Sequence, residues 1–220
     1  YALLRNADIA VESVDARQMA ELTMTFDQFE PTHIVHLAAI SSAVTANQVP
    51  GLAYDLQISS LRNVLELCRL KGSKVERVSF MSSSTVYGDF EGDSVDETVR
   101  PSPRGVYANG KYIGERMMRE AWNLFGTSYS IIRPSALYGI RCVSGRVSQK
   151  FVENALTGKP LLLEGCGSGR LDFTHIDDVV QGIILGLFLD GGRSRTFNIT
   201  FGNARTIADL AGIIQEYIPE

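Results

Sequence analysis

Short apolar runs rich in β-branched residues alternate with longer amphipathic segments, and this alternation constrains the fold more than any other feature of the chain. Short apolar runs predict strands, and apolar residues at helical spacing predict helices. The expected strands are 33–38, 75–81 and 128–133, and the expected helices between them are 52–71 and 106–124. Strands that alternate with helices in this way indicate βαβ units. We therefore predict an α/β protein with a doubly wound parallel sheet.

Beyond Gly139 the sequence changes character, because glycines divide it into shorter pieces. The glycine cluster 165–169 is typical of a loop. The expected elements are helices at 176–189 and 207–217, with Thr206 as the cap of the second, and a strand at 196–199. We expect the apolar run 183–189 to be core. This part of the chain is predicted to be smaller and richer in loops.

The composition excludes several classes of protein. A net charge of −4 without a basic cluster argues against a nucleic-acid partner. The longest apolar run, 183–189, is far shorter than the ~20 residues that a membrane span needs. The three cysteines, Cys68, Cys142 and Cys166, have unrelated spacings and suit a reducing compartment. We therefore expect a cytoplasmic protein without a membrane or nucleic-acid partner.

The histidines have structural interpretations. His36 lies inside the apolar run 33–38, and we expect it to be a hydrogen-bonded core residue. His175 stands close to Asp177 and Asp178, but no third ligand has the spacing of a metal site. No bound metal is therefore expected.

Tyr107 and Lys111 are the first candidates for chemistry. They lie four residues apart in the expected helix 106–124, so their side chains share one face. A tyrosine with a pKa near 10 is a poor base at neutral pH, but a nearby ammonium favours the phenolate. The pair can therefore act as an acid–base device. Chance is the alternative interpretation, because this spacing occurs in many helices.

Hydroxyl side chains follow the expected strand 75–81. They are Ser82, Ser83, Ser84 and Thr85, at the edge where ligands bind to parallel sheets. If the chain stays extended, alternation places Ser83 and Thr85 on one side and Ser82 and Ser84 on the other. A polar turn that satisfies its own backbone is the alternative interpretation, and both remain open.

Together, the hydroxyl-rich strand end and the Tyr-x-x-x-Lys motif on the next long helix resemble the extended short-chain dehydrogenase/reductase family. More narrowly, they resemble its NAD-dependent epimerase/dehydratase group, which acts on nucleotide sugars. Other segments are similar to this group in the same order along nearly the whole chain: 15–17, 36–39, 86–88, 96–98, 133–139, 158–161 and 165–178.

The resemblance implies a role for each candidate residue. Tyr107 exchanges a proton with a sugar hydroxyl, Lys111 holds the ribose and lowers the Tyr107 pKa, and Ser83 hydrogen-bonds the reacting oxygen. The implied cofactor contacts are Asp15, Ala16, Leu37, Ala38, Ala39, Gln57, Ser82, Tyr107, Lys111, Pro134 and Ala136. The implied substrate contacts are Ser83, Ser84, Thr85, Tyr107 and Arg170.

The resemblance also implies an organisation. Residues 1–140 would form a nicotinamide-dinucleotide-binding domain of Rossmann type, without its first strand and glycine-rich turn. Residues 141–220 would form mainly a substrate-binding lobe, with helix 176–190 packed back on the first domain. NAD is the expected cofactor, with NADP as the open alternative. A homodimer through helices 52–71 and 106–124 is expected.

The chain departs from the family pattern at particular positions. Gln57 stands where the family commonly has asparagine, Gly110 replaces the usual serine before the lysine, and Arg170 lies one place earlier than the usual arginine. The family's dehydratases carry a carboxylate directly after the catalytic hydroxyl, where this chain has Ser84 and Thr85.

The expected function is therefore a nucleotide-sugar epimerase, acting at C4 of a UDP-sugar through a transient keto sugar. The alternatives are a nucleotide-sugar reductase or dehydratase and a non-catalytic NAD(P)-binding protein. A serine hydrolase ranks last, because the chain has no Gly-x-Ser-x-Gly motif.

Overall fold

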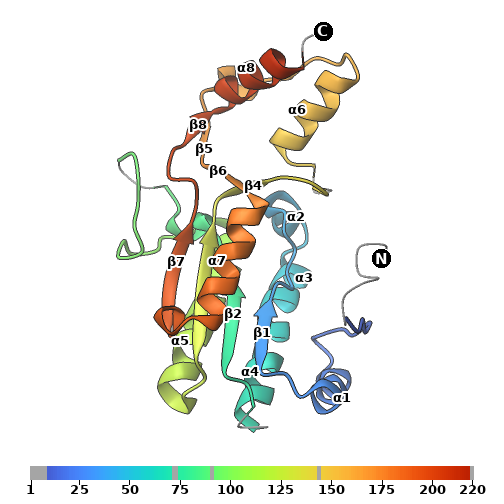
Figure 1. Ribbon diagram of the computed structural model, residues 1–220, viewed down its shortest axis with the longest axis vertical. Helices are drawn as coiled ribbons and strands as arrows, with labels where there is room; N and C mark the ends of the chain where they lie inside the picture. The colour runs from blue at the N-terminus through green and yellow to red at the C-terminus, as the bar shows by residue number, and fades with distance from the viewer. Residues whose placement is uncertain (1–8, 71–73, 90–91, 143–144, 219–220) are drawn as a thin grey trace.

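Four parallel strands form the central sheet, in the order β1-β2-β3-β7 (Figure 1). The computed structural model describes residues 9–70, 74–89, 92–142 and 145–218. The strands are β1 (His33–His36), β2 (Arg77–Met81), β3 (Tyr129–Pro134) and β7 (Arg195–Ile199). Val78 of β2 lies in register with Ile34 on one side and Tyr129 on the other. Because helices cover both faces, the prediction of a doubly wound α/β sheet of Rossmann type is confirmed.

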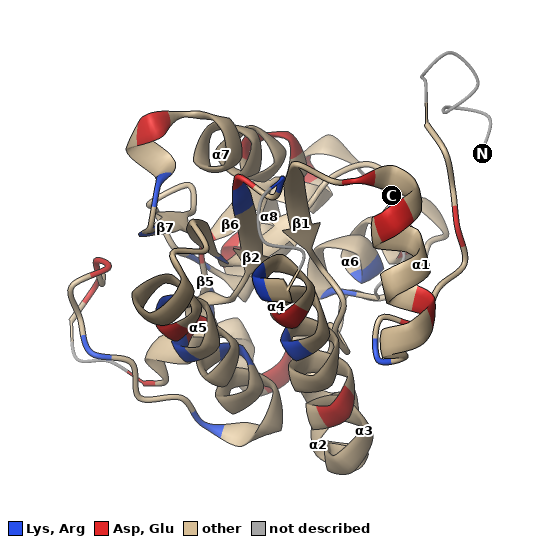
Figure 2. Ribbon diagram, turned by 90° about the horizontal axis from the view of Figure 1, so that it is seen from below, with Lys and Arg blue, Asp and Glu red and all other residues tan. Residues whose placement is uncertain are grey.

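Helices α4 and α5 cover one face of the sheet, and α7 covers the other, as the view from below shows (Figure 2). Their bounds are α4 (Ser60–Leu70), α5 (Gly105–Phe125) and α7 (Ile176–Phe188). Leu61, Leu67, Phe80 and Met118 are among the buried residues that fill the space between α4, α5 and the sheet. Helix α1 (Met19–Phe29) adds Leu22 and Phe26 to this core against α4.

The predicted helix 52–71 is not uniform. Helix α2 (Ala43–Gln48) precedes α3 (Pro50–Tyr54), and the π-helical turn η2 (Asp55–Ser59) joins α3 to α4. Pro50 begins α3, a position where its missing N–H costs no hydrogen bond. Lys71 and Gly72, where the predicted helix ends, lie outside the described residues.

Helix α5 packs unusually close to the sheet. A Cβ atom on Gly114 would lie 2.4 Å from Cζ of Phe80, so only glycine permits this approach. The helix ends at Gly126, whose φ of 74° is the left-handed conformation common after a helix C-terminus. The predicted bounds 106–124 are therefore correct to within one residue at each end.

A buried ion pair joins α5 to β3. Both side chains are almost fully buried, with Arg133 Nη2 2.6 Å from Glu115 Oε2 and Arg133 Nε 2.7 Å from Glu115 Oε1. Ser82 donates to the same carboxylate over 2.6 Å. Arg133 also donates to the Tyr87 hydroxyl, which donates to Asn198 of β7. This network connects α5, β3, β7 and the chain after β2.

The C-terminal part of the chain contributes to two regions. Strand β7 completes the main sheet beside β3, and α7 packs on β2 and β3. Helices α6 (Val147–Leu156) and α8 (Ile207–Tyr217) pack together above the sheet around Phe151, Ala211 and Ile214 (Figure 1). Thr206 caps α8 through a reciprocal capping box with Asp209, so the predicted cap is confirmed.

Short elements connect these two regions. Strand β4 pairs with β6 in parallel and β5 pairs with β8 antiparallel. Their bounds are β4 (Ala136–Tyr138), β5 (Arg170–Leu171), β6 (Phe173–His175) and β8 (Arg205–Thr206). The turns are the 3₁₀ helices η3 (Ser84–Tyr87), η4 (Glu164–Gly167) and η5 (Asp190–Gly192).

The prediction that the run 183–189 is core is wrong for most of its residues. Leu187 is buried, but Ile184, Leu185 and Phe188 are about half exposed. The physical reason is that a helix lying on a sheet buries only one side, and this run is apolar on all sides. Within the described residues, no helix is both long and apolar enough to cross a membrane.

We expect Glu115→Gln to lower the free energy of unfolding by about 3–5 kcal/mol, because it leaves the charge of Arg133 buried without its carboxylate partner. Urea denaturation measures this loss. The matched control is Glu120→Gln on the same helix, whose carboxylate is exposed and 4.0 Å from Arg116. Equal losses in the two variants would contradict the structural importance of the buried pair.

Candidate active site

The candidate site lies at the carboxyl ends of β1 and β2, against the first turns of α5. Strand β2 ends at Met81, and Ser84–Tyr87 turn into the 3₁₀ helix η3. The alternation predicted for residues 82–85 therefore stops at Ser83. Both Ser82 and Ser83 are buried, whereas Thr85 is exposed. The turn brings Thr85 back, so that its Oγ1 donates to Ser83 Oγ over 3.0 Å.

Tyr107 meets this hydroxyl cluster. It lies in the first turn of α5, is partly buried and is within hydrogen-bonding reach of Ser83. Ser83 also accepts a hydrogen bond from the backbone N–H of Thr85, which orients its hydroxyl. The structure therefore brings Ser83, Thr85 and Tyr107 together.

Lys111 lies one turn further along α5 and points at the end of β2. Its Nζ donates to the Met81 carbonyl over 2.7 Å and lies 5.8 Å from the centre of the Tyr107 ring. Only 3% of the residue is exposed. Burial disfavours the ammonium and lowers the pKa of Lys111 to about 8.

The pKa of Tyr107 shifts against the sequence-based expectation. Burial raises it, and this effect outweighs the Ser83 hydrogen bond and the charge of Arg146, which both lower it. The expected depression of this pKa by Lys111 is therefore wrong for the protein without ligands. The reason is that Tyr107 and Lys111 are desolvated together, so each loses hydration of its charged form.

His36 is a buried residue next to the candidate site. It is buried at the end of β1, and its Nε2 lies 3.0 Å from Ser60 Oγ. Because the Ser60 hydroxyl donates its proton to the Leu56 carbonyl, Nε2–H of His36 must be the donor to Ser60. Burial, followed by the charge of Lys111, lowers the His36 pKa to about 4. The prediction of a hydrogen-bonded core histidine is confirmed.

Gln57 has an unpaired polar side chain, and the residues that follow β1 have exposed apolar side chains. Gln57 is 3% exposed, yet neither of its amide atoms has a hydrogen-bond partner among the described residues. Leu37 and Ala38 are exposed directly after β1, and Ala39 is partly buried. A buried amide without a partner indicates a ligand that can hydrogen-bond it, and residues that follow a parallel strand lie where such sheets bind ligands.

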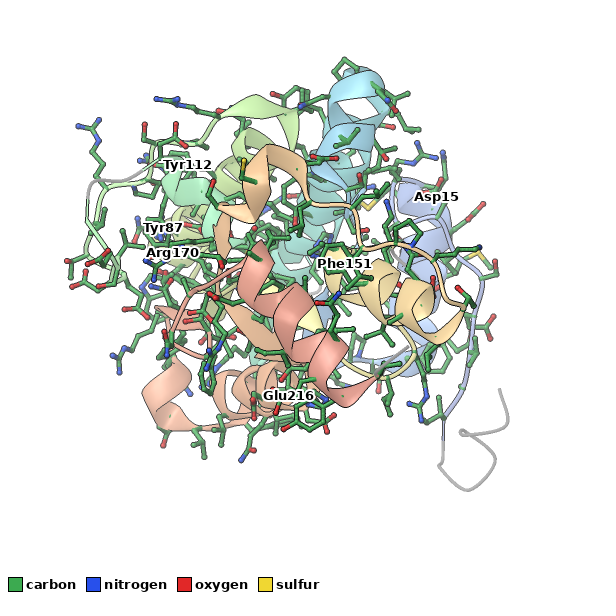
Figure 3. All side chains as sticks on the ribbon, turned by 90° about the horizontal axis from the view of Figure 1, so that it is seen from above. Asp15, Tyr87, Tyr112, Phe151, Arg170 and Glu216 are labelled. Carbon is green, nitrogen blue, oxygen red and sulfur yellow. The ribbon has the colours of Figure 1, made fainter. Side chains whose placement is uncertain are left out.

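Asp15 and Ala16 form a separate group. Arg17 holds the Asp15 carboxylate with Nη2 2.6 Å from Oδ2, and these hydrogen bonds lower the Asp15 pKa to about 2. Asn63 of α4 donates to the Ala16 carbonyl over 3.0 Å. In the view from above, Asp15 lies on the opposite side of the molecule from Tyr87 (Figure 3). A ligand that contacts both ends must be extended.

The remaining candidates lie around the small sheets. Pro134 is the last residue of β3, and Ala136 begins β4, where its N–H donates to the Asp172 carbonyl. Arg170 is exposed on β5 and donates to the Ala204 carbonyl over 3.1 Å. No contact links Arg170 to Tyr107 or Ser83 within the described residues.

Sequence reasoning missed Glu115 and Arg146. Glu115 follows Lys111 by four residues, so the i, i+4 spacing that identified Tyr107 and Lys111 could have extended to it. Arg146 is different, because only the fold brings its charge near Tyr107. It also lines a cavity of about 240 Å³ with Tyr138, Ile140 and Ile176.

His175 has the structural role that was expected. The His175 ring accepts a hydrogen bond from the Asp177 N–H and so caps α7. Among the residues that the structure describes, no group of His, Cys, Asp and Glu side chains could hold a metal ion.

Comparisons with known proteins agree with the resemblance predicted from the sequence. A family model described as the NAD dependent epimerase/dehydratase family matches residues 2–200. UDP-glucuronate 4-epimerase 1 of Arabidopsis thaliana is 28% identical over 235 residues, which cover 99% of this chain and 54% of that protein. The dTDP-glucose 4,6-dehydratase of Neisseria gonorrhoeae is 29% identical over 229 residues, which cover 98% of this chain and 66% of that protein.

A solved structure gives the same picture. The UDP-glucose 4-epimerase of Thermus thermophilus, in complex with NAD, has a TM-score of 0.87 to this chain at 27% identity. The match covers 94% of this chain and 68% of that one. The chain thus spans only part of its relatives, about half of the length of the Arabidopsis epimerase.

The low pKa of Lys111 predicts a pH dependence of stability. Between about pH 8 and the ordinary lysine value of 10.5, the unfolded chain binds the Lys111 proton more tightly than the folded protein does. Stability from this group therefore rises with pH across that window. We therefore expect the free energy of unfolding of wild type to rise relative to that of Lys111→Met between pH 8 and 10.5, by roughly 2–3 kcal/mol.

Urea denaturation at pH 8, 9 and 10.5 measures this difference. Lys159→Met is the control, because Lys159 is exposed after α6 and its removal should give a difference that is constant with pH. A constant difference for Lys111→Met as well would mean that Lys111 is not desolvated.

Proposed function

We propose that this chain, which belongs to the NAD-dependent epimerase/dehydratase family, acts as a nucleotide-sugar epimerase at C4 of a UDP-sugar. The observation that carries the proposal is the contact of Tyr107 with Ser83, beside a buried Lys111 and a strand end that offers only hydroxyl groups. A UDP-glucuronate 4-epimerase and a UDP-glucose 4-epimerase among the similar proteins support C4 as the reacting position.

Tyr107 exchanges the proton in this proposal. As the phenolate, its oxygen would accept the proton of the sugar 4-hydroxyl, and the resulting phenol would return that proton after the keto sugar has turned over. Ser83 would donate a hydrogen bond to the reacting oxygen, while the Thr85 hydroxyl donates a hydrogen bond to Ser83 Oγ. The charge of Arg146 and the hydrogen bond with Ser83 favour the phenolate, and burial opposes it. When it is charged, Lys111, whose Nζ lies 5.8 Å from the centre of the Tyr107 ring, would favour the phenolate as well.

The proposed cofactor is NAD, which would supply a reversible hydride acceptor for the sugar carbon when bound. The residues that would hold it begin with Asp15 and Ala16 at one end and finish with Lys111 at the other. The other proposed contacts are Leu37, Ala38 and Ala39 after β1, Gln57, Ser82, Tyr107, Pro134 and Ala136. The separation between Asp15 and the Tyr87 side of the molecule suits an extended dinucleotide (Figure 3).

A dehydratase is the second candidate, because one similar protein is a dTDP-glucose 4,6-dehydratase. Loss of water from a keto sugar needs an acid for the departing hydroxyl and a base for the carbon-bound proton. Ser84 and Thr85 supply neither near neutral pH. Glu115 is the carboxylate bound to Ser82, but the Arg133 pair already occupies both of its oxygens. These residues favour the epimerase.

The substrate is proposed to lie over Ser83, Ser84 and Thr85, with Arg170 reaching it from the C-terminal lobe. Residues 1–140 would then bind the dinucleotide and residues 141–220 mainly the sugar nucleotide. Strand β7 and helix α7 belong to both parts, because they follow the lobe in sequence but pack with the main sheet.

We also propose a cytoplasmic homodimer. Within the described residues none of the cysteines forms a disulfide, which suits a reducing compartment. The outer faces of α4 and α5 mix charges with exposed apolar groups, including Arg62, Ile113 and Arg116. Two such helix pairs could form a four-helix bundle.

Ile113→Glu should convert the dimer to monomer in sedimentation velocity, whereas Ile140→Glu, outside α4 and α5, should leave it a dimer. A dimer in both variants would place the interface elsewhere.

The activity is tested by incubating the purified protein and NAD with UDP-glucose, UDP-glucuronic acid and dTDP-glucose. We expect interconversion at C4 of a UDP-sugar, seen by NMR, and no 6-methyl resonance from any of the three. Appearance of a 6-methyl resonance would favour the dehydratase instead.

In the same assay, Tyr107→Phe should lower turnover by roughly a hundredfold or more, because the proton carrier is lost. Tyr112→Phe removes a hydroxyl from the next turn of the same helix and should retain the activity. Near-normal turnover in Tyr107→Phe would remove this tyrosine from the mechanism.

A further inference from the structure

Gln57 is a buried amide without hydrogen bonds. Only 3% of the residue is exposed, and neither Oε1 nor Nε2 has a partner in the part of the chain that the structure describes. Buried polar groups are rarely left unsatisfied, because they lose their hydration and gain nothing in return. A donor and an acceptor held in this state indicate a ligand that offers both.

The position of Gln57 in the fold is also unusual. It is the central residue of the π-helical turn η2, between α3 and α4. A π-helical turn holds one residue more than an α-helical turn, and such turns are frequent at functional sites. Asp55 is bound by Arg17, and Ser59 donates to Asp55, so the turn is held from the Asp15 side of the molecule.

Gly110 lies directly against this amide. A Cβ atom on Gly110 would be 2.3 Å from Gln57 Oε1 and 2.9 Å from its Cδ. The amide therefore occupies the space that any side chain at position 110 would need. Glycine within a helix is less stable than alanine, so Gly110 lowers the stability of α5 at the position that makes room for Gln57.

In the sequence of α5, Gly110 stands between the two residues that the proposed reaction uses. Gly110 directly precedes Lys111 and follows Tyr107 by three residues. The two departures from the family pattern, at 57 and at 110, are therefore one local feature of the structure.

We propose that Gln57 and Gly110 are a size-matched pair that forms one contact for the nicotinamide nucleoside. Gly110 provides the space, and the Gln57 amide donates to and accepts from a group of the bound nucleoside, such as a hydroxyl. The inference rests on the proposed function only for the identity of the ligand. The packing of the pair is independent of it.

The first experiment is Gln57→Met, which keeps the side-chain length and removes the donor and the acceptor. The dissociation constant for NAD, measured by calorimetry, should rise about tenfold. The urea midpoint without NAD should not fall, because the buried orphan is removed. Wild-type affinity in Gln57→Met, or a fall in its midpoint without a change in affinity, would overturn the proposal. Gln48→Met, exposed at the end of α2, is the control.

The second experiment tests the size match with a cycle of Gly110→Ser, Gln57→Asn and the double variant. Gly110→Ser alone should weaken NAD binding about tenfold or more and lower the urea midpoint. In the double variant the shorter amide leaves space for the serine, so affinity and midpoint should return close to those of Gln57→Asn. Equal effects of Gly110→Ser in both backgrounds would overturn the pair. Gly212→Ser controls for helix propensity, because a Cβ atom at that position would meet no atom within 4 Å.

The outcomes separate this inference from the proposed function. NAD binding without epimerase activity would count against the proposed function and leave the pair in place. If the wild-type protein bound no NAD, the ligand assigned to Gln57 would be wrong, and the urea midpoints of the cycle would still decide the packing of the pair.

Discussion

The buried ion pair between Glu115 and Arg133 is the interaction on which the arrangement of the site depends. It joins the helix that carries Tyr107 and Lys111 to the strand beside β2. Two charges removed from water are costly unless every hydrogen-bonding position is filled. Here Ser82, Arg119 and Tyr87 fill those positions. The same bonds that offset the cost also set where β2 ends relative to α5.

Because α5 is held this close to the sheet, the reactive groups are desolvated before any ligand binds. Lys111 has the Met81 carbonyl as a hydrogen-bond partner and a lowered pKa. Tyr107 has a raised pKa in the same environment. Opposite shifts in an acid and a base that lie side by side keep both in their neutral forms over a wider pH range. A ligand that adds charge or excludes water from this place can shift that balance.

The site has two ends that differ in their chemistry. At one end Arg17 binds Asp15 and Asp55, which ties the start of the chain to the π-helical turn. At the other end hydroxyl groups surround Tyr107. The amide of Gln57 lacks a hydrogen-bond partner among the described residues, so this is the part of the site whose hydrogen bonds a ligand would have to complete. Core packing holds both ends: Val14 and Ala16 on either side of Asp15 pack against the core, and Met118 and Ala121 bury α5 in it.

The sequence by itself determined the parallel α/β fold, through the alternation of short apolar runs with amphipathic segments. The extents of α5 and α7 and the pairing of Tyr107 with Lys111 followed from periodicity within single elements. It also identified the hydroxyl groups at the end of β2. Three features were decided only by the tertiary structure: the direction of the Tyr107 pKa shift, the exposure of Ile184 and Phe188, and the contact of Gln57 with Gly110. Burial and close contact are properties of neighbours that lie far apart in the chain. Glu115 and Arg133 are 18 residues apart, and no local pattern states that they meet.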